Sequence, residues 1–204
     1  MENYAELMFT EAVRDLQEAA GTRAGFAAAY PGRTSAVFDA QTRAFLAERV
    51  SFYIASVNAD GWPYIQHRGG PPGFIKITGP SQIACGDYPG NKQFITQGNL
   101  QSEARVSLFF MDYLSRARLK VQGYARLMAY AAAPPDLQAI IPAKPAPERV
   151  LIIDAVALDW NCPKYIPVML PEALVKQVAV EKFAALTREN EALRAEIARL
   201  KVEG

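Results

Sequence analysis

Residues 52–76, FYIASVNADGWPYIQHRGGPPGFIK, carry the pattern that decides the fold of this chain. Phe52–Val57 is apolar or small at nearly every position, which is typical of a strand buried on both faces. Asn58–Gly61 supplies a turn, because its final glycine can adopt the left-handed backbone conformation. Trp62–Arg68 then returns as the partner strand. The stretch therefore predicts a β-hairpin.

Short strands continue downstream of this hairpin. The predicted strands are Phe74–Thr78, Gln82–Cys85, Arg105–Met111, Arg116–Met128 and Val150–Leu158. Arg116–Met128 alternates most clearly, with basic and amide side chains on one face and apolar ones on the other. Six or seven short antiparallel strands, with one helix expected after Gly90, predict a mainly β fold. We expect a small barrel over residues 51–170.

The flanking segments, residues 1–50 and 171–204, are expected to be helical. Thr10 is a good N-cap for a helix that ends at Gly21, and a second helix is expected over Thr42–Arg49. These N-terminal helices are interpreted as a cover for a core built elsewhere. The chain therefore divides into a helical cover, a barrel domain and a C-terminal helix.

The C-terminal segment carries a heptad repeat. The d positions are Leu186, Leu193 and Leu200, and the a positions are Phe183, Asn190 and Ile197. In a parallel dimer, Glu189 would face Arg194 of the other chain, and Glu196 would face Lys201. A single asparagine among leucines selects two strands and one register, at a cost in stability. The repeat predicts a dimeric coiled coil; the alternative is a solitary amphipathic helix packed on its own barrel.

Composition argues against several partners and compartments. A net charge of +1 without a basic run disfavours nucleic acid and anionic membranes. No apolar span approaches the roughly 18 residues that cross a bilayer, and the N-terminus lacks the order of a signal peptide, so we expect a cytoplasmic protein. Cys85 and Cys162 have no metal-ligand spacing, so neither a metal site nor a disulfide framework is expected. Cys162 is interpreted as a redox or packing thiol, with packing favoured.

Two glycine-marked turns carry the candidate binding chemistry. His67 and Arg68 end the second strand of the hairpin, and Gly69 after them lets the backbone approach a ligand closely. The fork of donors on arginine suits phosphate oxygens, and histidine can both donate and accept. The Gly90–Lys92 turn precedes a predicted helix, whose free N–H groups attract anions.

Each turn also has a plainer explanation. His67 can be a structural histidine beside a tight turn, while Asn91 caps the helix and Lys92 is solvated. Together, at the ends of consecutive hairpins, the two turns favour a phosphate site. Arg118 and Lys120 share one strand face and can serve a polar ring system or a ribityl chain, although a solvated strand face explains them too.

The order of these motifs resembles that of the FMN-binding proteins related to pyridoxamine 5'-phosphate oxidase. The resemblance is strongest to one branch of that family, on the motifs DGWPYIQHRGGPPGF, GNKQFITQGN, MDY-x(3)-ARLK-x(2)-G and DWNCPKYI. It extends from Phe9 to about Pro167. It implies a split β-barrel that dimerises and binds FMN at the subunit interface.

The resemblance also implies roles for individual residues. The FMN phosphate would be held at the end of the second strand and at the helix-opening turn. The expected cofactor-binding residues are His67, Arg68, Gly69, Asn91, Lys92, Gln93, Arg118 and Lys120. Arg118 stands where the family commonly places a glutamine near the flavin ring, and a cation there would favour the anionic reduced ring.

Oxidation of vitamin B6 is not expected. True pyridoxamine phosphate oxidases end in a segment whose arginine and histidine engage the substrate, whereas this chain has Trp160–Tyr165 followed by the heptads. The expected function is an FMN-dependent oxidoreductase acting on an unidentified small molecule, with a donor such as NAD(P)H. The alternative is a non-catalytic carrier or sensor of flavin, deazaflavin or haem. No catalytic residue stands out, since one histidine supports no Ser-His-Asp set and no carboxylate pair is evident.

Overall fold

The computed structural model describes residues 3–30, 36–161 and 163–203, so Cys162 lies outside the described residues. The chain divides into two compact units. The first comprises Met1–Asp112 and Ala117–Lys164, and the second comprises Tyr113–Arg116 and Tyr165–Gly204. The expected domain boundaries at residues 51 and 171 stay a prediction.

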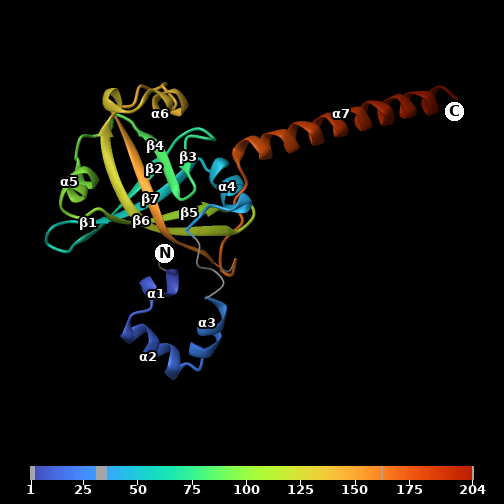
Figure 1. Cartoon of the computed structure of the whole chain (residues 1–204). Helices are drawn as coiled ribbons and strands as arrows, with labels where there is room; N and C mark the ends of the chain where they lie inside the picture. The colour runs from blue at the N-terminus through green and yellow to red at the C-terminus, as the bar shows by residue number, and fades with distance from the viewer. Residues whose placement is uncertain (1–2, 31–35, 162, 204) are drawn as a thin grey trace. The chain divides into compact units, whose positions relative to one another are not determined.

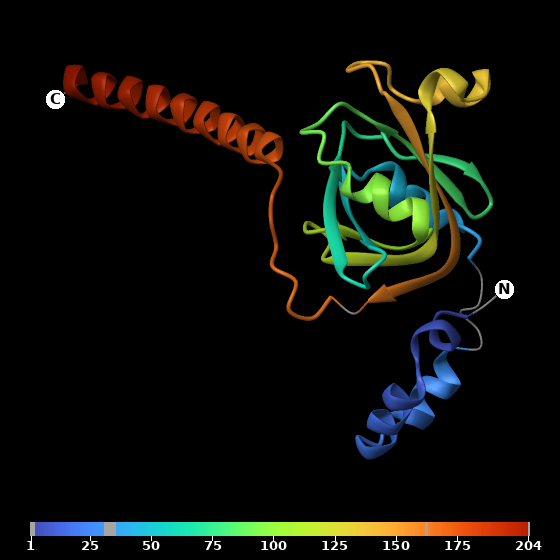
Figure 2. The same ribbon diagram turned by 90° about the vertical axis from the view of Figure 1, so that its left-hand side faces the viewer.

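The described residues of the first unit form a seven-stranded antiparallel sheet in the order β2-β1-β5-β6-β7-β4-β3. Its strands are β1 (Ser51–Val57), β2 (Pro63–Gly69), β3 (Lys76–Gly79), β4 (Gln82–Asp87), β5 (Arg105–Asp112), β6 (Ala117–Ala129) and β7 (Arg149–Asn161). The consecutive strands β2 and β3 lie at opposite edges, and the sheet curls into a barrel that is split between them (Figure 2). The predicted fold class, a mainly β split barrel with flanking helices, is confirmed.

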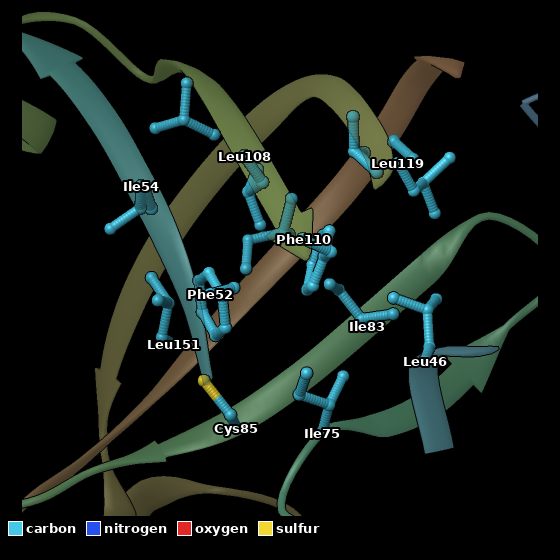
Figure 3. Packing of buried hydrophobic residues seen from close by; sticks show 14 of the residues in the cluster. Leu46, Phe52, Ile54, Ile75, Ile83, Cys85, Leu108, Phe110, Leu119 and Leu151 are labelled. Atoms are coloured by element: carbon cyan, nitrogen blue, oxygen red, sulfur yellow. The ribbon is translucent and has the colours of Figure 1, made fainter. Parts of the chain in front are cut away.

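The core lies inside this barrel, where alternate residues of the strands meet (Figure 3). Phe52 of β1 stacks on Phe74 at a centroid distance of 6.0 Å and packs against Phe110 of β5 at 5.2 Å. The expectation that β1 is buried on both faces is wrong for the single chain. Successive side chains of a strand point to opposite faces, and Tyr53 and Val57 on the outer face are exposed.

The α-helices are marked in Figure 1: α1 (Tyr4–Met8), α2 (Glu11–Ala19), α3 (Arg23–Ala29), α4 (Ala40–Ala47), α5 (Ile95–Ser102), α6 (Pro135–Ile140) and α7 (Glu172–Glu203). A short 3-10 helix, η1 (Tyr130–Ala132), follows β6 in the chain. The predicted cap of α2 is confirmed, because the Thr10 hydroxyl accepts a hydrogen bond from the Val13 amide. α4 begins two residues earlier than expected, since the Asp39 carboxylate accepts from the Thr42 amide at 2.7 Å. α7 is the expected C-terminal helix, and its pairing stays a prediction.

Two strand pairings place the candidate site. β4 pairs with β7 so that Asp87, at the end of β4, lies opposite Arg149, at the start of β7. β2 lies at one sheet edge, and the chain from the end of β4 leads into α5.

Among the described residues, no helix has the length and hydropathy that crossing a bilayer requires.

Candidate functional site

A polar groove lies between β2, the β4–β7 pair and the loop that leads into α5. Its cavity volume is about 70 Å³. The lining side chains that bear on its chemistry are Gln66, Arg68, Asp87, Lys92, Gln97 and Arg149. The groove therefore collects residues from five separate segments of the first unit.

The base of the groove is a buried carboxylate shared by two arginines. Arg68 donates from Nη1 to Asp87 Oδ1, and Arg149 donates from Nε to Asp87 Oδ2 at 2.6 Å. Asp87 is only 5% exposed, so its charge requires such partners. Glu148, on the more exposed side, contacts Arg149 Nη2 at 3.1 Å. The carboxylate thus holds both guanidinium groups in fixed orientations.

One strong donor of this cluster remains unused. Arg68 Nε is buried and lacks a hydrogen-bond partner among the described residues. Lys92 adds a further positive charge to the lining, which brings the sum for Arg68, Arg149, Lys92, Asp87 and Glu148 to +1. A buried unpaired donor costs free energy, so an anion that accepts from this nitrogen would be stabilised.

The loop before α5 has a strained, turned backbone. Lys92 and Phe94 have positive φ values of 60° and 54°, a conformation that costs side chains other than glycine free energy and concentrates at ligand sites. Asn91 Oδ1 accepts from the Gln93 amide at 3.2 Å. Phe94 occupies the N-cap of α5 and makes no side-chain cap hydrogen bond in the described structure. Asn91 therefore shapes the turn and does not cap the helix.

Polar contacts fix α5 beside the groove. The Thr96 hydroxyl donates to Gln66 Oε1 of β2 at 2.7 Å. Asn99 donates from Nδ2 to the Ser56 hydroxyl of β1 at 2.9 Å in a buried position. The side-chain oxygen of Gln97 is buried and has no partner among the residues described. The start of α5, with its outward-facing amides, is thus anchored at the groove.

Four of the predicted cofactor residues line this groove together: Arg68, Asn91, Lys92 and Gln93. His67 does not, because neighbouring residues of β2 point to opposite faces. Its ring contacts Tyr53 of β1 edge-on at a centroid distance of 5.5 Å. The expectation that both side chains of the His-Arg pair face one phosphate therefore does not fit this groove.

The remaining predicted residues lie on the outer face of the sheet. His67, Tyr53, Phe109, Lys120 and Asp159 lie opposite one another on the successive strands β2, β1, β5, β6 and β7. Lys120 is already engaged, since its Nζ lies 3.6 Å from Asp159 Oδ2 and 5.8 Å from the centroid of the Tyr4 ring. Burial, followed by the charge of Asp159, raises the pKa of Tyr4.

Arg118 lies on the same outer face, opposite Met111 of β5. Its Nε is buried and has no hydrogen-bond partner within the described chain. The predicted site is thus split between two surfaces, with Arg118 and Lys120 on one and Arg68 and Lys92 on the other. The assignment of any of these residues to a cofactor stays a prediction.

Sequence reasoning missed Asp87 and Arg149. Asp87 follows the predicted strand Gln82–Cys85 and precedes Tyr88-Pro89, and Arg149 lies 62 positions later, after a connection rich in proline. Nothing in that spacing indicates contact. The one usable signal is the antiparallel pairing of the two strands, which would have placed both charges at the same end of the barrel.

Similar solved structures are distant from this chain. HupZ of Group A Streptococcus has 18% identity and a TM-score of 0.42, over 55% of this chain and 86% of that one. An FMN-binding protein of Syntrophomonas wolfei has 14% identity and a TM-score of 0.44, over 71% and 97%. General stress protein 26 of Bacillus anthracis has 12% identity and a TM-score of 0.40, over 58% and 88%. At such values the likenesses establish neither a ligand nor an activity.

Among curated proteins, none matches this chain. The family model described as pyridoxamine 5'-phosphate oxidase, however, matches residues 38–158. That match begins at the residue before the Asp39 cap of α4 and ends within β7, so it includes both arginines of the groove. Because it covers more than half of the sequence, the chain belongs to the pyridoxamine 5'-phosphate oxidase family.

Proposed function

We propose that this protein binds FMN and that the groove at the start of α5 holds the phosphate. The observation that carries the proposal is the pair of arginines that share buried Asp87, together with the unused donor on Arg68. Family membership supports flavin as the cofactor, and the chemistry of the groove supports phosphate as the group held there.

The residues present fit a phosphate monoester. Arg68 and Arg149 offer guanidinium donors in orientations fixed by Asp87, and Lys92 offers a point charge. The amides at the start of α5 add the positive end of a helix dipole. A Cβ built on Gly90 would meet nothing within 4 Å, so the turn leaves open space beside these donors.

We propose an oxidoreductase on an unidentified small molecule as the activity. Bound flavin supplies hydride or electron transfer, and the chain supplies binding, orientation and electrostatics. Arg68, Lys92 and Arg149 would anchor the cofactor at its phosphate. Arg118, whose unused buried nitrogen lies on the outer face and not in the groove, would place positive charge beside the flavin ring where a second copy of the chain packs on that face.

A second copy of the chain belongs to this proposal. The family resemblance implies FMN at a subunit interface, and the outer face of the sheet carries large exposed apolar side chains, among them Tyr53 and Ile65 at 42% and 66%. Such a patch is typical of an interaction surface. A second barrel packed there would cover the part of this face that bears Arg118, whereas Tyr4 of α1 already lies over Lys120.

A non-catalytic carrier or sensor is the second candidate. The described lining of the groove includes no histidine, and its two carboxylates, Asp87 and Glu148, are both paired with Arg149. Bleaching of the bound flavin by NADPH, followed by reoxidation by a test acceptor, distinguishes an oxidoreductase from a carrier, which would remain oxidised.

The phosphate assignment is tested by comparing FMN with riboflavin, which lacks the phosphate. Arg68→Ala combined with Lys92→Ala should weaken FMN binding by at least about a hundredfold, since charge-assisted bonds contribute roughly 1.5–3 kcal/mol each. Riboflavin binding should change little. Near-native FMN affinity in the folded double variant would refute the assignment of these residues to the phosphate.

A further inference from the structure

The second unit carries an apolar surface along one long helix. α7 is continuous over 32 residues, or about 48 Å at the usual helical rise. Its heptad side chains are exposed along the whole repeat, with Leu186 at 47%, Leu193 at 56% and Leu200 at 56%. Exposing an apolar stripe of this length to water is unfavourable, so we expect another apolar surface to pack against this face of α7.

The stripe begins earlier than the sequence repeat indicated. An apolar groove, which the Lys182 side chain also lines, runs over the start of α7 and is lined by Leu174, Val178, Phe183 and Leu186, among others. Val175, Ala179 and Phe183 follow one another at intervals of four, after which the 3-4 alternation continues to Leu200. Two consecutive spacings of four, where a heptad repeat alternates three and four, are equivalent to an insertion of four residues. Such an insertion is called a stutter, and a coiled coil accommodates it by local unwinding. One seam can therefore extend from residue 175 to residue 200.

The charges beside the seam select its partner and direction. The g positions Glu189 and Glu196 are acidic, whereas the e positions Arg194 and Lys201 are basic. In a parallel pair of identical helices, each g position faces an e position of the partner, so every such contact is attractive. An antiparallel pair would bring g against g and e against e, which joins like charges.

The polar residue in the seam selects the same arrangement. Asn190 occupies an a position between Leu186 and Leu193. In a parallel pair two copies of Asn190 meet and can hydrogen-bond to each other. In an antiparallel pair each would face an apolar d residue and lose that bond.

We propose that α7 forms a parallel, in-register two-stranded coiled coil with α7 of a second copy of this chain. The seam runs from Val175 to Leu200, with Asn190 fixing the register. A parallel pair brings the two starts of α7 together, at the usual interaxial distance of about 8–10 Å. Because the barrel precedes α7 in the chain, both barrels are then connected to the same, N-terminal end of the coiled coil. The seam shares no residue with the groove that is proposed to hold the phosphate, so the pairing of α7 does not rest on flavin binding.

The test is disulfide crosslinking of the full chain under mild oxidation. Leu200→Cys places a thiol at a d position that meets its own copy in a parallel pair, and Ala195→Cys, at an f position on the opposite face, is the matched control. The expected result is that Leu200→Cys forms covalent dimers at least tenfold faster than Ala195→Cys. Adding Glu189→Lys and Glu196→Lys should remove that advantage, because every cross-pair becomes repulsive.

Three results would overturn the proposal. Equal crosslinking of the d and f variants would mean that α7 does not pair through this seam. Crosslinking of Leu200→Cys only with a protein other than itself would assign the stripe to another partner. Crosslinking that is unchanged by Glu189→Lys and Glu196→Lys would overturn the parallel arrangement, because only that arrangement brings these g positions against the basic e positions of the partner.

Discussion

Arg149 gives the sharpest test of the groove, because the structure alone implicates it. Arg149→Met removes the guanidinium but keeps most of the apolar stem, which limits the loss of packing. Nε of Arg149 donates to Asp87 Oδ2 at 2.6 Å, and Arg68 engages the other oxygen. The change therefore removes one of the three cations and leaves Asp87 with one arginine. The summed charge of the five groups falls from +1 to 0.

The expected effect on FMN binding follows from that loss. A hydrogen bond to a charged group is worth roughly 1.5–3 kcal/mol, which corresponds to a loss in affinity of about 10- to 140-fold. Riboflavin, which lacks the phosphate, should lose less than about threefold. Titration calorimetry of both ligands at one fixed salt concentration measures the two dissociation constants, because charge contributions depend on ionic strength.

Arg126 provides a matched control for Arg149. Arg126→Met changes the net charge by the same amount but removes an exposed pair with Asp154 that lies outside the groove. It should leave FMN affinity unchanged. If folded Arg149→Met bound FMN within threefold of the wild-type protein, Arg149 would not contact the phosphate. Equal losses for FMN and riboflavin would mean that Arg149 supports the fold of the groove rather than the ligand.

Three further outcomes are expected. Gly123→Ala should lower the free energy of unfolding by roughly 1–3 kcal/mol in urea titrations, because its Cβ would lie 2.5 Å from the Asp154 carbonyl oxygen at the register shift between β6 and β7. Gly98→Ala in α5, where a Cβ meets nothing within 4 Å, should raise that free energy by up to about 1 kcal/mol. A Gly123→Ala variant more stable than Gly98→Ala would contradict the close approach of the two strands at Gly123. Burial raises the pKa of Cys85 to about 12, so this thiol should stay protonated at pH 8 in the folded protein. In a Cys162→Ala background, Cys85 should therefore react with a thiol reagent at pH 8 roughly a thousandfold more slowly in the folded protein than in the protein unfolded by urea. Equal rates would show that the core around Cys85 is open to solvent. Arg118→Gln should lower the midpoint potential of bound FMN, since a cation beside the ring stabilises the reduced anion; an unmoved potential would place Arg118 away from the ring.

The sequence predicted the barrel well because its signals are local. The Asn58–Gly61 turn, the alternation in β6 and the Thr10 cap are each determined by residues close together in the chain. The sequence predicts that both faces of β1 are buried, but only the inner face is, since a run of apolar residues does not reveal how many faces are covered.

The sequence predicts only those groove residues that have a local signal, which are Arg68 and Lys92, and not those that meet through strand pairing. Arg68 and Lys92 stood out through the glycines beside them. His67 was grouped with Arg68 because the two are adjacent, yet adjacency in a strand separates side chains onto opposite faces. Asp87 and Arg149 meet only through the register of β4 with β7, which a single sequence does not specify.

The most direct test of the account is the visible absorption spectrum of the purified full-length protein after incubation with FMN and gel filtration. Flavin bands should elute with the protein, and the Arg68→Ala, Lys92→Ala double variant should elute without them. A wild-type protein that folds but elutes colourless after exposure to FMN would contradict the central claim.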